Sequence, residues 1–448
     1  MNDTIAAIST SLGVGAISII RVSGPDTIKI VNKIFSNDLT KVKTHTVNYG
    51  FIKDNDKVID EVIVTVMLSP RSFTTEDTVE INSHGGIATT NKILELLLLN
   101  GCRLAKPGEF TERAFLNGRI DLEEAEGVMN LIEAKTDISR ELAINQLTGK
   151  VSNLIKDLRD DLVQVLANIN VNIDYPEYDD VEDITLPLLK EKIDLIKEKI
   201  TLILNESKNG KIIKEGITTS IIGKPNVGKS SLLNNLLEED KAIVTNIEGT
   251  TRDIVEGTIN IDGILLNIID TAGIRKTDNI VERIGVDKSL ELIDKSDLVL
   301  FLLNNNEKIS TEELSLLERI KTKNHIILIN KNDLDRVIDD SNLDNPIYIS
   351  TKTNEGISEL KQRIKEIFNL EKLEKSDLTY LTSARSIAIL KDVATKITEI
   401  ENSINNNATI DMLELDIKYI WEKLGEIIGE TYEEEFLDEL FSRFCLGK

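Results

Sequence analysis

The stretch from Gly223 to Ser230 reads G-x-x-x-x-G-K-S and is the clearest chemical signature in the sequence. A β-rich run precedes it and an amphipathic helical pattern follows it, so we expect a loop between a strand and a helix. Backbone N–H groups in such a loop, and at the start of the helix, point at phosphate oxygens. Lys229 adds a positive charge for the β- and γ-phosphates, and the Ser230 hydroxyl reaches Mg²⁺. The predicted phosphate site comprises Asn226, Val227, Gly228, Lys229, Ser230 and Ser231.

Three later segments indicate that the nucleotide is GTP. The run G-T-T-R-D at 249–253 offers Thr251 as a second hydroxyl for Mg²⁺. A strand that ends at Asp270 places a carboxylate near the metal, and Gly273 can turn toward the γ-phosphate. The Asp333 carboxylate of N-K-x-D accepts two N–H groups from guanine, whereas adenine offers no matching pair. The rest of the predicted site is Thr245, Asn246, Ile247, Glu248, Gly249, Thr250, Thr271, Ala272, Asn330, Lys331, Ser350, Thr351 and Lys352.

How the chain hydrolyses GTP is less obvious, because Ile274 follows D-T-A-G at the position where many GTPases have a glutamine that orients the attacking water. Arg252 or Arg275 could act as an arginine finger, although an arginine in a switch region is more often a solvated side chain. A monovalent cation could supply the same charge, held by the Asn226 side chain and by carbonyls of 245–250; Asn226 could instead make a structural hydrogen bond. Glu282 could position the water through a second water, or could be a surface charge on a helix.

Composition restricts the class of protein. The 448 residues carry a net charge of −24, which opposes diffuse attraction to nucleic acid, so an RNA substrate would need a local basic patch or a basic partner. The two cysteines, Cys102 and Cys445, form no C-x-x-C, and the three histidines form no metal-binding set. The N-terminus has no signal-peptide pattern and the longest apolar run, at 93–99, is too short for a membrane span. We therefore expect a soluble, cytoplasmic protein that has no membrane partner.

The pattern of the chain predicts an α/β plus all-α fold. Residues 1–118 alternate strand and helix signals, with a hairpin around Asp54–Asp56. Helical patterns fill 119–210 and 376–448, and their apolar stripes are Leu189, Ile193, Ile196, Ile200 and Ile203, then Leu390, Val393, Ile397 and Ile400. Residues 211–375 alternate strands and helices again, including a hairpin at Asp262-Gly263. This predicts a P-loop domain inserted into a discontinuous helical domain.

Several segments outside the nucleotide motifs carry a family resemblance. They are RVSGP (21–25), SFTTEDTVEINSHGG (72–86), KPGEFTERAFLNGRIDLEEAEGVMNLIEAKT (106–136) and the terminal FCLGK. With the nucleotide motifs, they resemble the bacterial MnmE (TrmE) tRNA-modification GTPases over nearly the whole chain. The resemblance implies an N-terminal α/β folate-binding and dimerisation domain, a discontinuous helical domain and an inserted Ras-like P-loop G domain.

The resemblance also implies a mechanism. K⁺ would activate hydrolysis when two G domains meet in a homodimer, and would take the place of an arginine finger. Its ligands would be Asn226, Thr245, Ile247 and Thr250, while Glu282 would orient the water and Lys229 would act on the phosphates.

The family works with an MnmG-type FAD protein, as a heterotetramer, and installs an aminomethyl-type group on C5 of the wobble uridine of certain tRNAs. The one-carbon unit comes from a tetrahydrofolate derivative (5-formyl- or methylene-THF). By motif position, the folate candidates are Arg21, Glu80, Arg119 and Lys448, with Cys445 as a catalytic cysteine nearby. Without the resemblance, these are ordinary surface or strand-end charges, and Cys445 is equally a packed small hydrophobe.

The chain departs from the family pattern at Lys224, Thr351, Leu446 and Arg119, of which only the last touches the folate prediction. A ribosome-assembly GTPase of the Era or Der kind is the alternative, but it predicts a basic RNA-binding appendage, and we find none. A non-catalytic GTP switch is a third possibility, and it predicts the loss of Lys229, Ser230 or Asp270, which are all present. The sequence does not specify the tRNAs, the amine donor (ammonium or glycine), the coupling of hydrolysis to modification or, by itself, the oligomeric state.

Overall fold

The computed structural model describes residues 3–174, 186–239, 255–269, 290–370, 377–432 and 434–447. The chain forms two compact units. Unit 1 consists of residues 1–132, 146–201 and 383–448, and unit 2 consists of residues 133–145 and 202–382. Each unit has its own hydrophobic core, and each is described by itself below.

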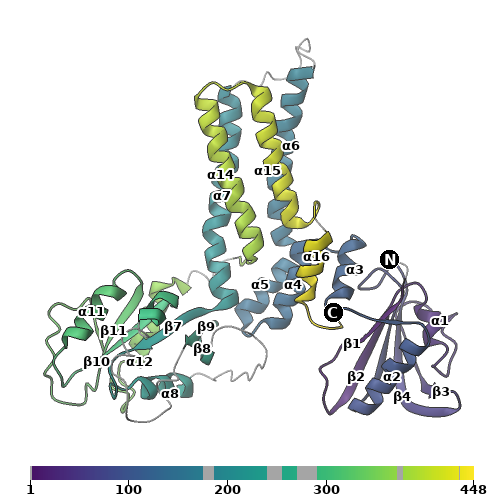
Figure 1. The fold of residues 1–448 in the computed structure, drawn as a ribbon, viewed down its shortest axis with the longest axis horizontal. Helices are drawn as coiled ribbons and strands as arrows, with labels where there is room; N and C mark the ends of the chain where they lie inside the picture. The colour runs from purple at the N-terminus through teal and green to yellow at the C-terminus, as the bar shows by residue number, and fades with distance from the viewer. Residues whose placement is uncertain are drawn as a thin grey trace. The chain divides into compact units, whose positions relative to one another are not determined.

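Unit 1 begins with a six-stranded sheet in the order β3-β4-β5-β2-β1-β6 (Figure 1). All neighbouring strands are antiparallel except β1 and β6. The predicted hairpin is confirmed, and its turn includes Asn55 in the left-handed region at φ 52°. The strands are β1 (Ile5–Ile8), β2 (Gly15–Ser23), β3 (Thr46–Asp54), β4 (Lys57–Met67), β5 (Thr78–Gly85) and β6 (Arg103–Leu104).

The two faces of this sheet bury different residues, because side chains alternate along a strand. On one face, Ala6 and Ile20 pack with the buried side of α2 (Ile87–Leu99), and α1 (Thr27–Val31) extends this core. On the other face, Ile5 and Ala7 pack with Phe110 of α3 (Glu109–Leu116). The sequence-predicted folate residues Arg21 and Glu80 belong to this second face, because Arg21 pairs with Ala7 and with Glu80.

The remainder of unit 1 is helical. It contains α4 (Leu122–Glu133), α6 (Lys150–Asp174), α14 (Ala384–Asn405), α15 (Ile410–Ile428), α16 (Glu434–Ser442) and the first half of α7 (Leu186–Glu215). In Figure 1, α14 and α15 lie side by side, and α15 also packs on α6. Both predicted apolar stripes are buried, on α7 and α14 respectively. None of the helices within the described ranges is long and apolar enough to cross a bilayer.

Unit 2 is built on a second six-stranded sheet, in the order β12-β11-β10-β7-β9-β8. Only β8 and β9 are antiparallel, and they form the predicted hairpin, whose turn is Asp262-Gly263. The strands are β7 (Ile217–Ile222), β8 (Val255–Ile261), β9 (Ile264–Ile269), β10 (Leu298–Asn304), β11 (Asn324–Asn330) and β12 (Ile347–Tyr348), and the helices include α8 (Lys229–Glu239), α11 (Thr311–Ile320), α12 (Ile357–Ile367) and most of α5 (Asp137–Leu147).

Every residue of β10 and most residues of β7 and β11 are buried, as expected for parallel strands that are covered on both faces. The carboxyl ends of parallel strands lie at one edge of a sheet, where ligands bind in folds of this kind. The loops after β7, β11 and β12 therefore meet at this edge. The chain thus combines α/β and all-α parts, with a Ras-like P-loop sheet in unit 2.

Candidate nucleotide and folate sites

The phosphate loop joins β7 directly to α8, as the sequence predicts. Its backbone turns through the left-handed region at Asn226 (φ 60°) and Gly228 (φ 102°). A Cβ atom at Gly228 would collide with the side-chain nitrogen of Asn330, so this position requires glycine for both its conformation and its space. The loop is therefore shaped by its own glycine and by a residue from a distant strand.

Lys229 folds back over this loop. Its ammonium group donates hydrogen bonds to the backbone oxygens of Gly223, at 2.6 Å, and Lys224, at 2.7 Å. Burial lowers the pKa of Lys229 below its ordinary value. Ser230 follows as the second residue of α8, so its hydroxyl lies beside the helix N-terminus, where backbone N–H groups attract an anion. The arrangement suits a Mg²⁺-bound polyphosphate.

Asn330 joins the phosphate loop to the segments predicted to read the base. Its Nδ2 donates to the Val227 carbonyl at 2.7 Å, and its Oδ1 accepts from the Thr351 N–H at 3.1 Å. Only 1% of Asn330 is exposed, so these bonds are shielded from water. One side chain at the end of β11 therefore positions both the phosphate loop and the loop after β12.

Asp333 is exposed and is oriented by a buried neighbour. The Ser350 hydroxyl donates to its Oδ1 at 2.9 Å, which leaves the other carboxylate oxygen and further lone pairs available for a base. Lys331 takes the left-handed region at φ 65°, and Lys352 is exposed in the turn after Thr351. Asn235 of α8 was not predicted, yet its amide donates to the Thr351 carbonyl at 2.8 Å. No local pattern distinguishes this asparagine from its neighbour in the sequence.

Part of the predicted nucleotide site lies outside the described residues. This part comprises Thr245, Asn246, Ile247, Glu248, Gly249, Thr250, Thr251, Asp270, Thr271, Ala272, Gly273 and Glu282. Within the described ranges, no group of three or more His, Cys, Asp or Glu side chains could hold a metal. The predicted metal ligands that lie within the described residues are Ser230 and Asn226. Asn226 is exposed on the phosphate loop, and its side chain makes no hydrogen bond to another described residue, which leaves its oxygen available to a cation.

The folate candidates Arg21 and Glu80 face each other across β2 and β5. Arg21 Nε donates to the Glu80 carboxylate at 2.9 Å, and its NH1 donates to the Gly447 carbonyl at 3.1 Å. The Arg21 guanidinium also lies over the Phe110 ring, 5.6 Å from its centroid. Glu80 therefore fixes a guanidinium between an aromatic ring and the end of the described chain.

Arg119, which follows α3, contacts a second aromatic residue of this region. Its guanidinium lies over the Phe73 ring at 4.8 Å and donates to the Phe73 carbonyl at 2.7 Å. Phe73 packs against the cluster that contains Phe110. The structure thus gathers Arg21, Glu80 and Arg119 around one aromatic patch. Because Phe110 is 0% exposed, a ligand would meet the guanidinium groups, which suit carboxylates.

The C-terminal segment lies beside this patch and is held there by backbone and side-chain hydrogen bonds. The Gly108 N–H donates to the Cys445 carbonyl at 3.2 Å, and the Ser9 hydroxyl donates to the Gly447 carbonyl at 3.0 Å. Cys445 is exposed, so its thiol is not the packed hydrophobe of the alternative interpretation. The last folate candidate, Lys448, lies outside the described residues.

Comparison with known proteins identifies relatives along the whole chain. The profile of the GTP-binding protein TrmE N-terminus matches residues 4–119, and that of the MnmE helical domain matches residues 122–445. The chain is 50% identical over 455 residues to the tRNA modification GTPase MnmE of Bacillus thuringiensis (strain Al Hakam), with 100% of this chain and 99% of the relative covered. It is 49% identical over 457 residues to the protein of the same name from Enterococcus faecalis (strain ATCC 700802 / V583), with 100% and 98% covered. The G domain of the T. maritima FeoB iron transporter aligns at 29% identity over 34% of this chain and 97% of that domain, with a TM-score of 0.25.

Proposed function

This chain belongs to the MnmE (TrmE) family of tRNA modification GTPases, and from this premise we propose that it uses GTP hydrolysis to support modification of the wobble uridine of tRNA. The chain is a GTP hydrolase. Its partner in the reaction would be an MnmG-type FAD protein, and the group added at C5 of U34 would be a (carboxymethyl)aminomethyl group. Because this chain has a net charge of −24, we expect the partner to supply most of the electrostatic attraction to tRNA.

The nucleotide residues have separate roles in this proposal. Lys229 and the N-terminus of α8 bind the phosphates, and Ser230, with Thr251, would hold Mg²⁺. Asp333 accepts the guanine N–H groups while Ser350 orients it. Asn330 connects the phosphate loop to the loop that contacts the base. A change at Asn330 should therefore alter the affinity for the phosphates and for the base together.

Hydrolysis would require K⁺ and a second G domain. K⁺ supplies positive charge beside the bond between the β- and γ-phosphates when it is bound. Asn226, exposed on the phosphate loop, is the described side chain that could contribute an oxygen ligand, together with Thr245, Ile247 and Thr250. Glu282 would orient the attacking water, because Ile274 cannot.

The N-terminal sheet would hold the one-carbon donor, a tetrahydrofolate derivative such as 5-formyl- or methylene-THF. Arg21 lies over Phe110 and Arg119 lies over Phe73, so both supply positive charge to this region, and Glu80 orients Arg21. Lys448 would add a further charge. Cys445 lies exposed beside this patch and would act in the transfer of the one-carbon unit. The protein would work in the cytoplasm as a homodimer. This homodimer would join the flavoprotein to form a heterotetramer.

One observation carries the proposal: a single chain holds both the Asn330-linked nucleotide site and the Arg21–Glu80 pair that binds the Gly447 carbonyl. A GTPase that served only as a switch or in ribosome assembly would have no use for the second site. This observation favours the tRNA-modification proposal over its alternatives.

The test is reconstitution with an MnmG-type flavoprotein, unmodified tRNA, GTP, K⁺, methylene-THF and either glycine or ammonium. Mass spectrometry of the tRNA nucleosides should detect a C5-modified uridine. We expect Lys229→Ala to abolish both GTP turnover and modification, and Arg21→Ala to abolish modification alone. If the uridine stays unmodified although this chain binds GTP and the flavoprotein binds FAD, the proposal is contradicted. Specific binding to ribosomal RNA would favour the ribosome-assembly alternative.

A further inference from the structure

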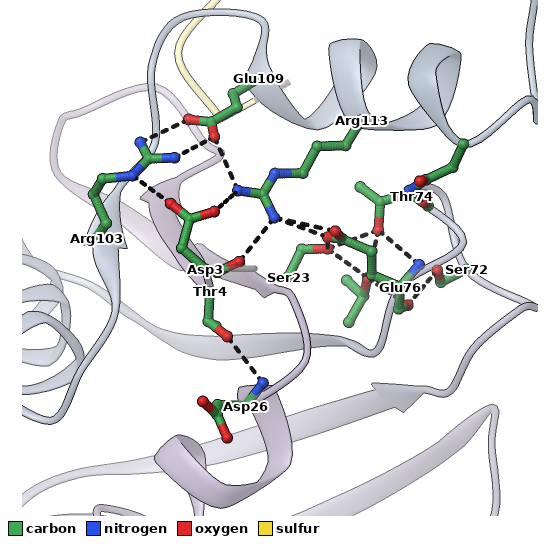
Figure 2. Close-up of polar contacts among 12 residues, drawn as sticks. Asp3, Thr4, Ser23, Asp26, Ser72, Thr74, Glu76, Arg103, Glu109 and Arg113 are labelled. Carbon is green, nitrogen blue, oxygen red and sulfur yellow. Dashed lines mark hydrogen bonds and ion pairs between the residues drawn. The ribbon is translucent and has the colours of Figure 1, made fainter. Parts of the chain in front are cut away.

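A buried ionic cluster lies beside the folate candidates and has no part in the function proposed so far. At its centre is Arg113 of α3 (Figure 2). The Arg113 side chain is 0% exposed. Its NH2 donates to Asp3 at 2.8 Å and to Glu109 at 3.0 Å, and its NH1 donates to Glu76 at 3.1 Å. Arg103 donates to the same Glu109 and Asp3 from a more exposed position.

Glu76 connects this cluster to the loop that precedes β5. Its second carboxylate oxygen accepts a 2.7 Å hydrogen bond from Ser23 of β2. Within the loop, the Ser72 hydroxyl donates to the Glu76 carbonyl at 2.6 Å. The Thr74 hydroxyl is 2.6 Å from that of Ser23, and the Thr74 carbonyl accepts from Asn117 at 2.7 Å. Polar contacts to β2 and to the α3 region therefore fix the loop Ser72–Glu76 at several points.

This loop carries Phe73, the residue that holds Arg119 through both its ring and its carbonyl. A shift of the loop would therefore move Phe73 and Arg119 away from Phe110. We propose that Arg113 is a positioning residue for the folate site, because it fixes the Ser72–Glu76 loop through Glu76 and thereby places Phe73 and Arg119. The ligand in this inference rests on the proposed function.

The geometry explains why arginine is needed at this position. The planar guanidinium bonds Glu76 on one nitrogen and Glu109 on the other, and also reaches Asp3, whereas a lysine ammonium would be a single point charge. Arg113→Lys would keep the positive charge among the carboxylates but would lose the simultaneous hydrogen bonds from two nitrogens to Glu76 and Glu109. Arg103→Lys is the matched control, since Arg103 contacts Asp3 and Glu109 but makes no contact with the loop among the described residues.

The experiment measures hydrogen exchange and ligand binding on the full chain. We expect Arg113→Lys to raise amide exchange of residues 72–76 at least tenfold relative to β3, and to weaken binding of 5-formyl-THF about tenfold. Arg103→Lys should change neither by more than about twofold. GTP turnover should be the same in both variants, because the nucleotide site belongs to unit 2. If Arg113→Lys fails to fold, Glu76→Gln tests the same connection from the loop side.

A double-mutant cycle separates positioning from general destabilisation. If Glu76 acts through Arg119, Glu76→Gln and Arg119→Ala should be non-additive in 5-formyl-THF affinity, with the second change adding less than about threefold. Full additivity, or unchanged exchange at residues 72–76 in Arg113→Lys, would overturn the positioning role. Absence of 5-formyl-THF binding by the unmodified chain would instead overturn the proposed function and the ligand named here, and the exchange result would still decide whether Arg113 fixes the loop.

Discussion

The Asn330 side chain donates a 2.7 Å hydrogen bond to the backbone carbonyl of Val227, although the two residues are 103 positions apart in the chain. This bond joins the segment expected to read guanine to the loop expected to bind phosphates. Because the same amide also accepts from the Thr351 N–H, its removal disturbs both sides of the nucleotide.

Asn330→Ala should therefore weaken binding of GTP and GDP alike. Loss of two buried hydrogen bonds, each worth about 1 kcal/mol, predicts a loss of affinity of roughly 10- to 100-fold. Titration with a fluorescent GDP analogue measures this. Asn332→Ala is the control and should bind almost normally, because the Asn332 side chain makes one long contact, 3.4 Å to Glu355, within the described part of the chain. Equal affinity for the two variants would show that the Asn330 link is not needed.

Asp333→Asn should change which base is accepted. The wild-type carboxylate can accept two guanine N–H groups, while an amide offers a donor that matches the extra carbonyl of xanthine. We expect GTP affinity to fall at least 100-fold and XTP affinity to rise, as measured by competition against a labelled nucleotide. Retention of GTP preference in the variant would rule out Asp333 as the base-reading residue.

Glu282→Ala should separate binding from hydrolysis. The variant should bind GTP within about twofold of wild type, because the carboxylate is assigned to the water and not to the nucleotide. Its K⁺-stimulated turnover should fall at least 100-fold in a single-turnover assay with labelled GTP. Unchanged turnover would remove Glu282 from the mechanism.

Glu123 of α4 should give unit 1 a specific pH dependence. Its side chain is 0% exposed, accepts from Gln146 at 2.9 Å and from Ser386, and has Arg385 at 3.6 Å. Burial, and then the neighbouring Glu126 charge, raise the pKa of Glu123 to about 7 from 4.5. Between these two values the folded state holds a proton that the unfolded state releases, so the free energy of unfolding should fall as pH rises and then level off above about pH 7.

Fluorescence of Trp421 during urea unfolding can measure this dependence, because it is the single tryptophan and belongs to unit 1. Glu123→Gln should remove the slope, which for one group is at most about 1.4 kcal/mol per pH unit. Glu133→Gln, at the exposed end of the same helix, is the comparison. An unaltered slope in Glu123→Gln would show that another group is responsible.

Features with a local repeat could be predicted from the sequence. The stripe from Leu189 to Ile203 is buried as expected, because the helical period alone decides which residues share a face. The turn at Asp262-Gly263 follows from the conformations that these two residue types tolerate, and Asp262 takes φ 46°. Fixed motif spacing likewise placed Lys229 at the start of α8, after the phosphate loop, and Asp333 in the loop after β11.

Features that depend on distant partners could not be predicted. Arg113 looks like an ordinary helix charge, and only the i,i+4 spacing of Glu109 hints at its pairing. Its other partners, Asp3 and Glu76, come from separate segments that meet only when the sheet and α3 have packed. The link between Asn330 and Val227 likewise requires β11 and β7 to lie in one sheet, which sequence spacing does not specify.

The central claim is that an alkali ion, held in part by Asn226, takes the place of an arginine finger, while Glu282 does the work of the missing glutamine. GTP turnover in K⁺ and in Na⁺ at equal ionic strength tests it most directly, with Asn226→Ala measured alongside. We predict turnover at least tenfold faster in K⁺ for the wild type, and equally slow turnover in both salts for Asn226→Ala with GTP binding retained. The same slow rate for the wild type in both salts would contradict the account.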